Sequence, residues 1–285
     1  MTQPDDGIHL SLDRLVALRR LAFGVQQGGH AQSHSGGTAG RRRGQGGDIH
    51  DLRPFQDGDD PRRVDPAATA RSGRPHVRTY HEDVDRTLLL VADFRSPMLW
   101  GSRGRLRSIA AAEALALEGW RTIAAGGRVG LHGEHDGGGV TLAPRPREAA
   151  MLDIASALVR MHEAAVALPA DGVTPDLGTL LAQSIARAVP GTQVVLATGY
   201  DQPGQDFAEV AEAAMRKCRL SILLIQDRIE LDPPRGVLPV RTPQGLRQVR
   251  FSAGTARDTL ERIGVPVVAV SAETDLFADQ SRAQA

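Results

Sequence analysis

Residues 87–93 have the sequence TLLLVAD, and this stretch decides the fold class. After the first threonine the run is apolar on both faces of an extended chain, and it ends in a carboxylate. Residues 193–198 and 220–226 repeat the apolar pattern, and segments of helical periodicity separate the three runs. A strand that is apolar on both faces needs helices on both sides to cover it. The pattern therefore predicts an α/β fold with a doubly wound, mainly parallel sheet flanked by helices.

The remaining elements of this domain follow from periodicity and turn residues. Strands are expected at 128–133, 139–143 and 266–270, and a hairpin joins 237–240 to 246–251 through Pro243, Gln244 and Gly245. Apolar residues at helical spacing predict the helices, which we place at 105–125, 146–168, 176–188, 205–218 and 255–263.

The first third of the chain is less regular. Residues 10–22 have the pattern of an amphipathic helix. Residues 24–47 consist mostly of Gly, Gln, Ser, His and Arg, which predicts a mobile loop, and 48–80 is irregular up to a half-exposed strand at 76–80. We therefore expect residues 1–82 to form an irregular N-terminal extension that packs on an α/β domain of residues 83–285.

Composition limits the classes of function. The chain has 285 residues, and its 34 basic and 34 acidic side chains give a formal net charge of zero, so no global field attracts nucleic acid. Aromatic residues, which stack on bases, make up only 4%. No apolar run reaches the roughly 18–20 residues that span a bilayer. Cys218 is the only cysteine, which excludes an internal disulfide. We expect a cytoplasmic protein without a membrane span or a nucleic-acid partner.

Sequence signatures of catalysis are missing. There is no Gly-x-Ser-x-Gly elbow, and His132 and His135 lack the His-Glu-x-x-His spacing of a zinc protease. A lone cysteine such as Cys218, at a helix end before a buried strand, is typical of packing. These observations favour a non-catalytic protein.

One series of motifs suggests a family. The sequence contains GRRRGQGGDI at 40–49, LRPF at 52–55, DGDDPRRVD at 57–65 and the strand that ends at Asp93, in that order. This order and spacing resemble a bacterial family, the von Willebrand factor A-like domain of unknown function 58 family, whose members are often encoded beside MoxR-type AAA+ ATPases. The resemblance implies a doubly wound α/β domain whose top loops, in related domains, form a metal-ion-dependent adhesion site with oxygen ligands for Mg²⁺.

The chain departs from that ligand pattern. Asp93 keeps the position of the first aspartate, but Arg95 and Pro97 take the places of the two serines. Thr174 matches the threonine of the second loop, and Gly199 stands where the third loop usually has an acidic residue. A guanidinium beside a divalent ion would repel it by several kcal/mol. We therefore hypothesise that Arg95 pairs with Asp93 in place of a metal ion. Asp201 lies close enough in sequence to supply an acidic group after a loop shift.

The acidic and basic residues before the sheet have a second interpretation. Pairs of arginine and carboxylate side chains are predicted to hold this irregular stretch in place, with a docking surface as the alternative. The residues of this ion-pair motif are Asp57, Asp59, Asp60, Arg62, Asp65 and Arg71. Pro66 stands where the family commonly has Trp, so a binding surface built on that aromatic ring is in question.

The sequence thus favours an adaptor or assembly factor without a cofactor. The resemblance implies a MoxR-type AAA+ ATPase and its client protein as partners. The expected contact residues are Asp93, Arg95, Ser96, Thr174 and Asp201. The alternative is a metal-dependent binder or hydrolase that holds Mg²⁺ with Asp93, Thr174 and Asp201.

Overall fold

The computed structural model describes residues 7–27, 43–56, 64–81, 86–169, 173–242, 245–250 and 254–277. The chain divides into two compact units, one made of residues 1–31 with 87–285 and the other of residues 32–86. The first helical segment therefore belongs to the same unit as the central sheet.

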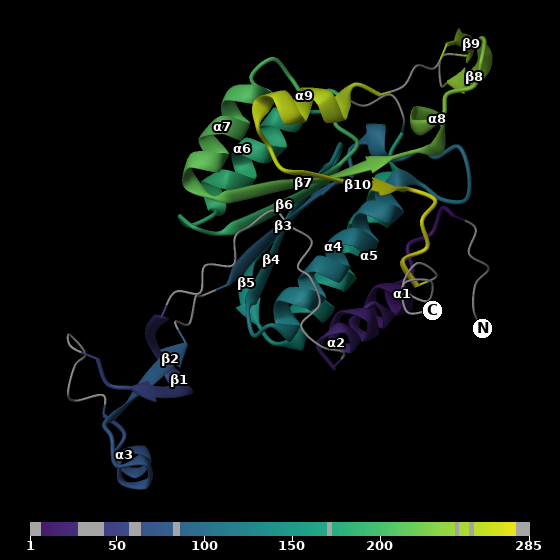
Figure 1. Ribbon diagram of the computed structural model, residues 1–285. Coiled ribbons are helices and arrows are strands. Elements are labelled where there is room, and N and C mark those ends of the chain that lie inside the picture. Colours follow the sequence, from purple (N-terminus) through teal and green to yellow (C-terminus); the bar gives the residue numbers. More distant parts are fainter. Residues whose placement is uncertain are drawn as a thin grey trace. The chain divides into compact units, whose positions relative to one another are not determined.

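The larger unit is built on a six-stranded sheet with the strand order β10-β7-β6-β3-β4-β5 (Figure 1). The strands are β3 (Thr87–Asp93), β4 (Arg128–His135), β5 (Gly138–Pro146), β6 (Gln193–Thr198), β7 (Arg219–Gln226) and β10 (Val267–Ser271). Every neighbouring pair is parallel except β4 with β5, which is antiparallel. The predicted α/β fold with a mainly parallel sheet is confirmed.

Helices cover both faces of this sheet. The helices α1 (Leu12–Ala17), α2 (Arg19–Gln27), α4 (Arg107–Ala124) and α5 (Glu148–Ala167) pack together on one side (Figure 1). On the other side lie α6 (Leu177–Arg187), α7 (Phe207–Lys217) and α9 (Ala256–Ile263). Leu88 and Leu90 belong to the first core, and Leu89 and Val91 belong to the second. The double-sided apolar pattern of β3 thus reflects burial from both directions.

Two polar contacts hold α1 on α4. The indole nitrogen of Trp120 donates to the backbone oxygen of Leu15 at 2.9 Å. The carboxylate of Glu113, which is fully buried, pairs with Arg14 and Arg105. A buried carboxylate needs such partners, because its desolvation is otherwise costly.

The smaller unit contains elements that sequence periodicity misses. The strand β1 (Arg43–Pro54) pairs antiparallel with β2 (His76–His81), and α3 (Pro66–Ser72) lies between them in sequence. The prediction of a loop up to residue 47 is wrong for residues 43–47, which begin β1, and residues 28–42 lie outside the described residues. The glycines of β1 hide its strand character, and pairing with β2 supplies the hydrogen bonds that a local pattern does not reveal.

Asp65 and Pro66 explain why α3 begins where it does. The side chain of Asp65 accepts a hydrogen bond from the backbone nitrogen of Ala68 at 2.7 Å, and Pro66 occupies the first helical turn. Both residues are favoured at helix starts. The proline in the place of a tryptophan therefore has a local structural role.

The predicted hairpin near the C-terminus is confirmed as β8 (Leu238–Thr242) and β9 (Gly245–Val249). Two short helices, η2 (Ser96–Met98) and α8 (Arg228–Leu231), were not predicted. Within the described parts of the chain, every helix is too short or too polar to cross a membrane.

Candidate functional site

Four loops meet where the parallel strands end. Asp93 is the last residue of β3, and the η2 turn follows it directly. Hydrogen bonds join this turn to the segment before α6, to the loop after β6 and to the end of β4. In open α/β sheets, this carboxyl edge is the usual place for a binding site.

The hypothesised pair of Asp93 and Arg95 is present. The Nε atom of Arg95 lies 2.8 Å from Oδ1 of Asp93, and Nη2 lies 2.9 Å from Oδ2. The backbone nitrogen of Arg95 also donates to Oδ1 at 3.2 Å. The exposed fractions of the two side chains are 1% for Asp93 and 0% for Arg95. This two-pronged geometry is the strong form of an arginine–carboxylate interaction.

Arg95 also joins neighbouring loops to the end of β3. Its Nη1 atom donates to the carbonyl of Pro175 at 2.6 Å, and Nη2 donates to the carbonyl of Asp201 at 3.0 Å. The guanidinium therefore connects the β3 end, the segment before α6 and the loop after β6. Because a guanidinium has five donors in one plane, a single arginine can bind a carboxylate and two carbonyls at once.

A divalent cation does not fit at Asp93. The two carboxylate oxygens offer about four acceptor positions. Arg95 takes three of them, and the hydroxyl of Thr198 donates to Oδ2 at 2.6 Å. Thr174 and Asp201 are engaged elsewhere, and the described residues contain no group of three His, Cys, Asp or Glu side chains able to hold a metal.

A second buried arginine, Arg107, was missed by sequence reasoning. Its Nη2 atom lies 2.6 Å from Oδ2 of Asp201, and Nη1 lies 3.1 Å from Oε1 of Glu230. The guanidinium stacks 4.5 Å from the ring centre of Trp100 and also donates to the carbonyl of Pro97. Burial raises the pKa of both Asp201 and Glu230, and the charge of Arg107 opposes this rise.

The arginine also explains the glycine in the third loop. A Cβ atom on Gly199 would lie 2.5 Å from Nη1 of Arg107 and 2.6 Å from Oδ2 of Asp201. Both distances are shorter than van der Waals contact. An acidic side chain at position 199 would therefore have to displace this ion pair.

Ser96, Thr174 and Asp136 form a separate polar cluster nearer the surface. The hydroxyl of Thr174 donates to Oδ2 of Asp136 at 2.8 Å, and the backbone nitrogen of Ser96 donates to Oδ1 at 3.2 Å. The hydroxyl oxygens of Ser96 and Thr174 are 2.7 Å apart. Sequence reasoning missed Asp136, because nothing local marks a carboxylate at the end of β4 as a partner of the β3 and α6 loops.

The predicted site residues thus separate into two groups. Asp93 and Arg95 are buried and shape the loops, whereas Ser96 and Thr174 are nearer solvent. The side chain of Asp201 is 37% exposed but is held by Arg107. Beside Thr174, the side chain of Val173 is 90% exposed, a large value for an aliphatic residue.

Most of the predicted ion-pair motif lies outside the described residues. This applies to Asp57, Asp59, Asp60 and Arg62. Asp65 caps α3, and Arg71, in the last turn of that helix, is exposed. The ion-pair network itself stays a prediction.

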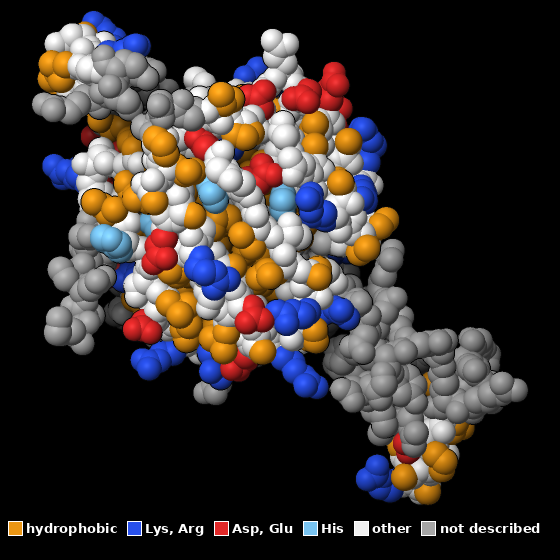
Figure 2. All heavy atoms as spheres, turned by 180° about the vertical axis from the view of Figure 1, so that it is seen from behind, with side chains coloured by type: hydrophobic (Ala, Val, Ile, Leu, Met, Phe, Trp, Pro, Cys, Tyr) orange, Lys and Arg blue, Asp and Glu red, His pale blue; other side chains and the backbone are white. Residues whose placement is uncertain are grey.

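The surface charge is mixed. On the face of the molecule in Figure 2, basic and acidic side chains are interspersed, with hydrophobic side chains between them. The described residues of this face present no broad basic patch of the kind that nucleic acid requires.

Fold and site together define an open, mainly parallel α/β protein in which Arg95 and Arg107 pair with Asp93, Asp201 and Glu230 near the carboxyl edge of the sheet. The chain belongs to the family described as "Protein of unknown function DUF58", whose model matches residues 51–263. A search of curated proteins found no match.

The chain is also similar to the crystal structure of an uncharacterized membrane spanning protein from Vibrio fischeri. Its identity to this chain is 16% over 69% of this chain and 95% of the other, with a TM-score of 0.21. At that TM-score the likeness carries no argument about function.

Proposed function

We propose that this protein is a non-catalytic adaptor or assembly factor that binds a protein partner through the loops at the carboxyl edge of its sheet. The observation that carries the proposal is the pairing of Asp93 with Arg95. The guanidinium of Arg95 occupies carboxylate oxygens that a cation would need, and it also joins the neighbouring loops to the end of β3.

Two features of these loops suit a protein contact. Arg95 and Arg107 join the loops to each other, which lowers the entropy that a partner must remove on binding. Val173 precedes Thr174 in the chain, and the hydroxyl oxygen of Ser96 lies 2.7 Å from that of Thr174. The surface therefore combines an exposed aliphatic group with hydroxyls. Within the predicted contact set, Ser96, Thr174 and Asp201 would meet the partner, and Asp93 with Arg95 would position them.

The partner we propose is a MoxR-type AAA+ ATPase, acting together with a client protein. Support comes from the motif order described above and from membership of the DUF58 family.

The test is co-purification of the full chain with a MoxR-type ATPase encoded beside it. Val173→Asp places a charge on the most exposed apolar residue of the loops and should reduce the yield of complex about tenfold. Val189→Asp is the matched control, because Val189 is 63% exposed but precedes β6 at the opposite edge of the sheet. Equal yields for the two variants would show that the loops are not the contact surface.

A further inference from the structure

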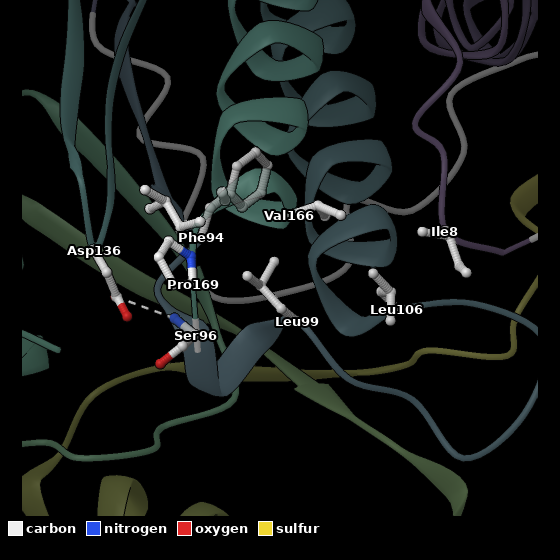
Figure 3. A pocket seen from close by; sticks show the side chains of 10 residues that line it. Ile8, Phe94, Ser96, Leu99, Leu106, Asp136, Val166 and Pro169 are labelled. Carbon is white, nitrogen blue, oxygen red and sulfur yellow. Dashed lines mark hydrogen bonds between the residues drawn. The ribbon is translucent and has the colours of Figure 1, made fainter. Parts of the chain in front are cut away.

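An apolar cleft of about 370 Å³ opens beside the cluster of Ser96, Thr174 and Asp136. Figure 3 shows Asp136 and Ser96 at one end of the cleft, with Leu99 and Val166 further along and Ile8 and Leu106 at the other end. Its volume is within the range of about 300–1,000 Å³ that is typical of ligand sites. The cleft thus has space for more than one side chain.

The apolar wall is partly open to solvent. The exposed fractions are 47% for Ile8, 41% for Val166 and 37% for Leu168. These three aliphatic side chains line one cleft, so they form a local apolar surface and are not scattered single residues. Covering them with apolar groups of a ligand would stabilise a complex, because it removes apolar surface from water.

At the polar end of the cleft, hydrogen bonds among the described residues fill only part of the acceptor capacity of the Asp136 carboxylate. Asp136 receives one hydrogen bond on each oxygen, whereas a carboxylate can accept about four. No arginine or lysine among the described residues lies within ion-pair distance of Asp136. Burial lowers the pKa of the neighbouring His135, and the charge of Asp136 opposes this shift.

We propose that the cleft binds a short segment of a protein partner in which a lysine or arginine is flanked by apolar residues. The basic group would donate to Asp136 and to the hydroxyl oxygen of Ser96, and the flanking side chains would cover Val166 and Leu168. The inference rests on the proposed function, because it names the chemistry that a protein partner presents to the same loops.

Charge selects among possible segments. An acidic segment is repelled by Asp136, and a purely apolar one removes water from the carboxylate without replacing the lost hydrogen bonds. A basic side chain brings both an aliphatic stem for the apolar wall and donors for the polar end. The cleft therefore discriminates by charge as well as by shape.

The experiment uses fluorescence polarisation of short labelled peptides with a central lysine flanked by leucine and phenylalanine in all orders. Matched sets carry norleucine or glutamate in place of the lysine. With the full-length protein, the best lysine peptides should bind about tenfold more tightly than their norleucine analogues. In Asp136→Asn this preference should disappear, because the charge is lost while the apolar wall is intact.

A second variant keeps the test independent of any change near Asp136. Val166→Arg fills the cleft and repels the basic group, and should weaken lysine-peptide binding about tenfold. Leu152→Arg is the control, because Leu152 is 44% exposed on the same helix α5 and lies about 21 Å away at 1.5 Å per residue. It should bind as the unmodified protein does.

Equal binding of lysine and norleucine peptides, or unchanged binding in Val166→Arg, would overturn the inference. The two proposals fail separately. If Val173→Asp loses the ATPase complex and the full-length protein shows no preference for lysine peptides, only the cleft proposal is rejected. A lysine preference that depends on Asp136, with an ATPase complex insensitive to Val173→Asp, supports the cleft and rejects the proposed loop contact.

Discussion

Asp93 and Asp136 are two carboxylates at the same edge of the sheet, and their surroundings differ. Asp93 is 1% exposed and accepts four hydrogen bonds, three of them from Arg95. Asp136 is half-buried, accepts two hydrogen bonds and faces an apolar cleft. The first has no capacity for a new ligand, and the second has. Within one edge, the acid that sequence motifs mark is therefore part of the architecture, whereas the unmarked Asp136 keeps unused acceptor capacity.

The largest loss of stability should come from breaking the pair of Asp93 and Arg95. Arg95→Met removes the guanidinium and leaves Asp93 buried without a counter-charge, which should lower the free energy of unfolding by about 3–5 kcal/mol. Urea denaturation followed by circular dichroism measures this change. Adding Asp93→Asn, which keeps an acceptor for Thr198 but removes the charge, should recover part of the loss. If the losses of the two single variants simply add in the double variant, the pairing of Asp93 with Arg95 is contradicted.

Arg107→Met tests the second buried arginine and should cost less, about 2–3 kcal/mol, because Asp201 and Glu230 retain access to water. The loss should also depend on pH. Burial raises the pKa of both acids above their ordinary values of 3.8 and 4.5, so the folded state holds more protons than the unfolded state just above those values. Their contribution to the free energy of unfolding therefore falls as pH rises.

Without the opposing charge of Arg107 the two pKa values rise further, so the decline in stability should become steeper and continue to higher pH. Urea denaturation between about pH 4 and pH 7 measures it. Arg121→Met, which removes an exposed pair with Glu118, is the control and should leave the pH profile unchanged. A profile for Arg107→Met parallel to that of the unmodified protein would refute this account.

Thr174→Val should have the smallest effect on stability, about 1 kcal/mol, because it removes one hydroxyl from the half-buried cluster at Asp136 and Ser96. Thermal denaturation measures it. The same substitution at the exposed Thr179 of α6 should change stability by less than about 0.5 kcal/mol. A loss of stability in Thr174→Val as large as that in Arg95→Met would contradict the difference between Asp136 and Asp93.

Much of the fold and one part of the site follow from local sequence. The apolar runs that became β3, β6 and β7 were predicted within one or two residues, because burial on both faces leaves a pattern in a short window. The contact between Asp93 and Arg95 was predictable for the same reason, since only Phe94 separates them in sequence.

The residues that meet over long sequence distances were not predictable. Arg107 contacts Glu230 across 123 positions, and Asp136 contacts Thr174 across 38. Such pairs depend on strand order and on the direction of each crossover, which no local pattern contains. The strand β1 was missed for a related reason, because its pairing with β2 rather than its own composition defines it.

The sequence by itself determined the α/β class, the order of most elements in the larger unit and the pairing of Arg95 with Asp93. Only the tertiary structure decided which carboxylate is available to a ligand. Composition and spacing specify what a segment of chain tends to do, whereas the burial and hydrogen bonding of a charged group depend on the segments that folding brings around it.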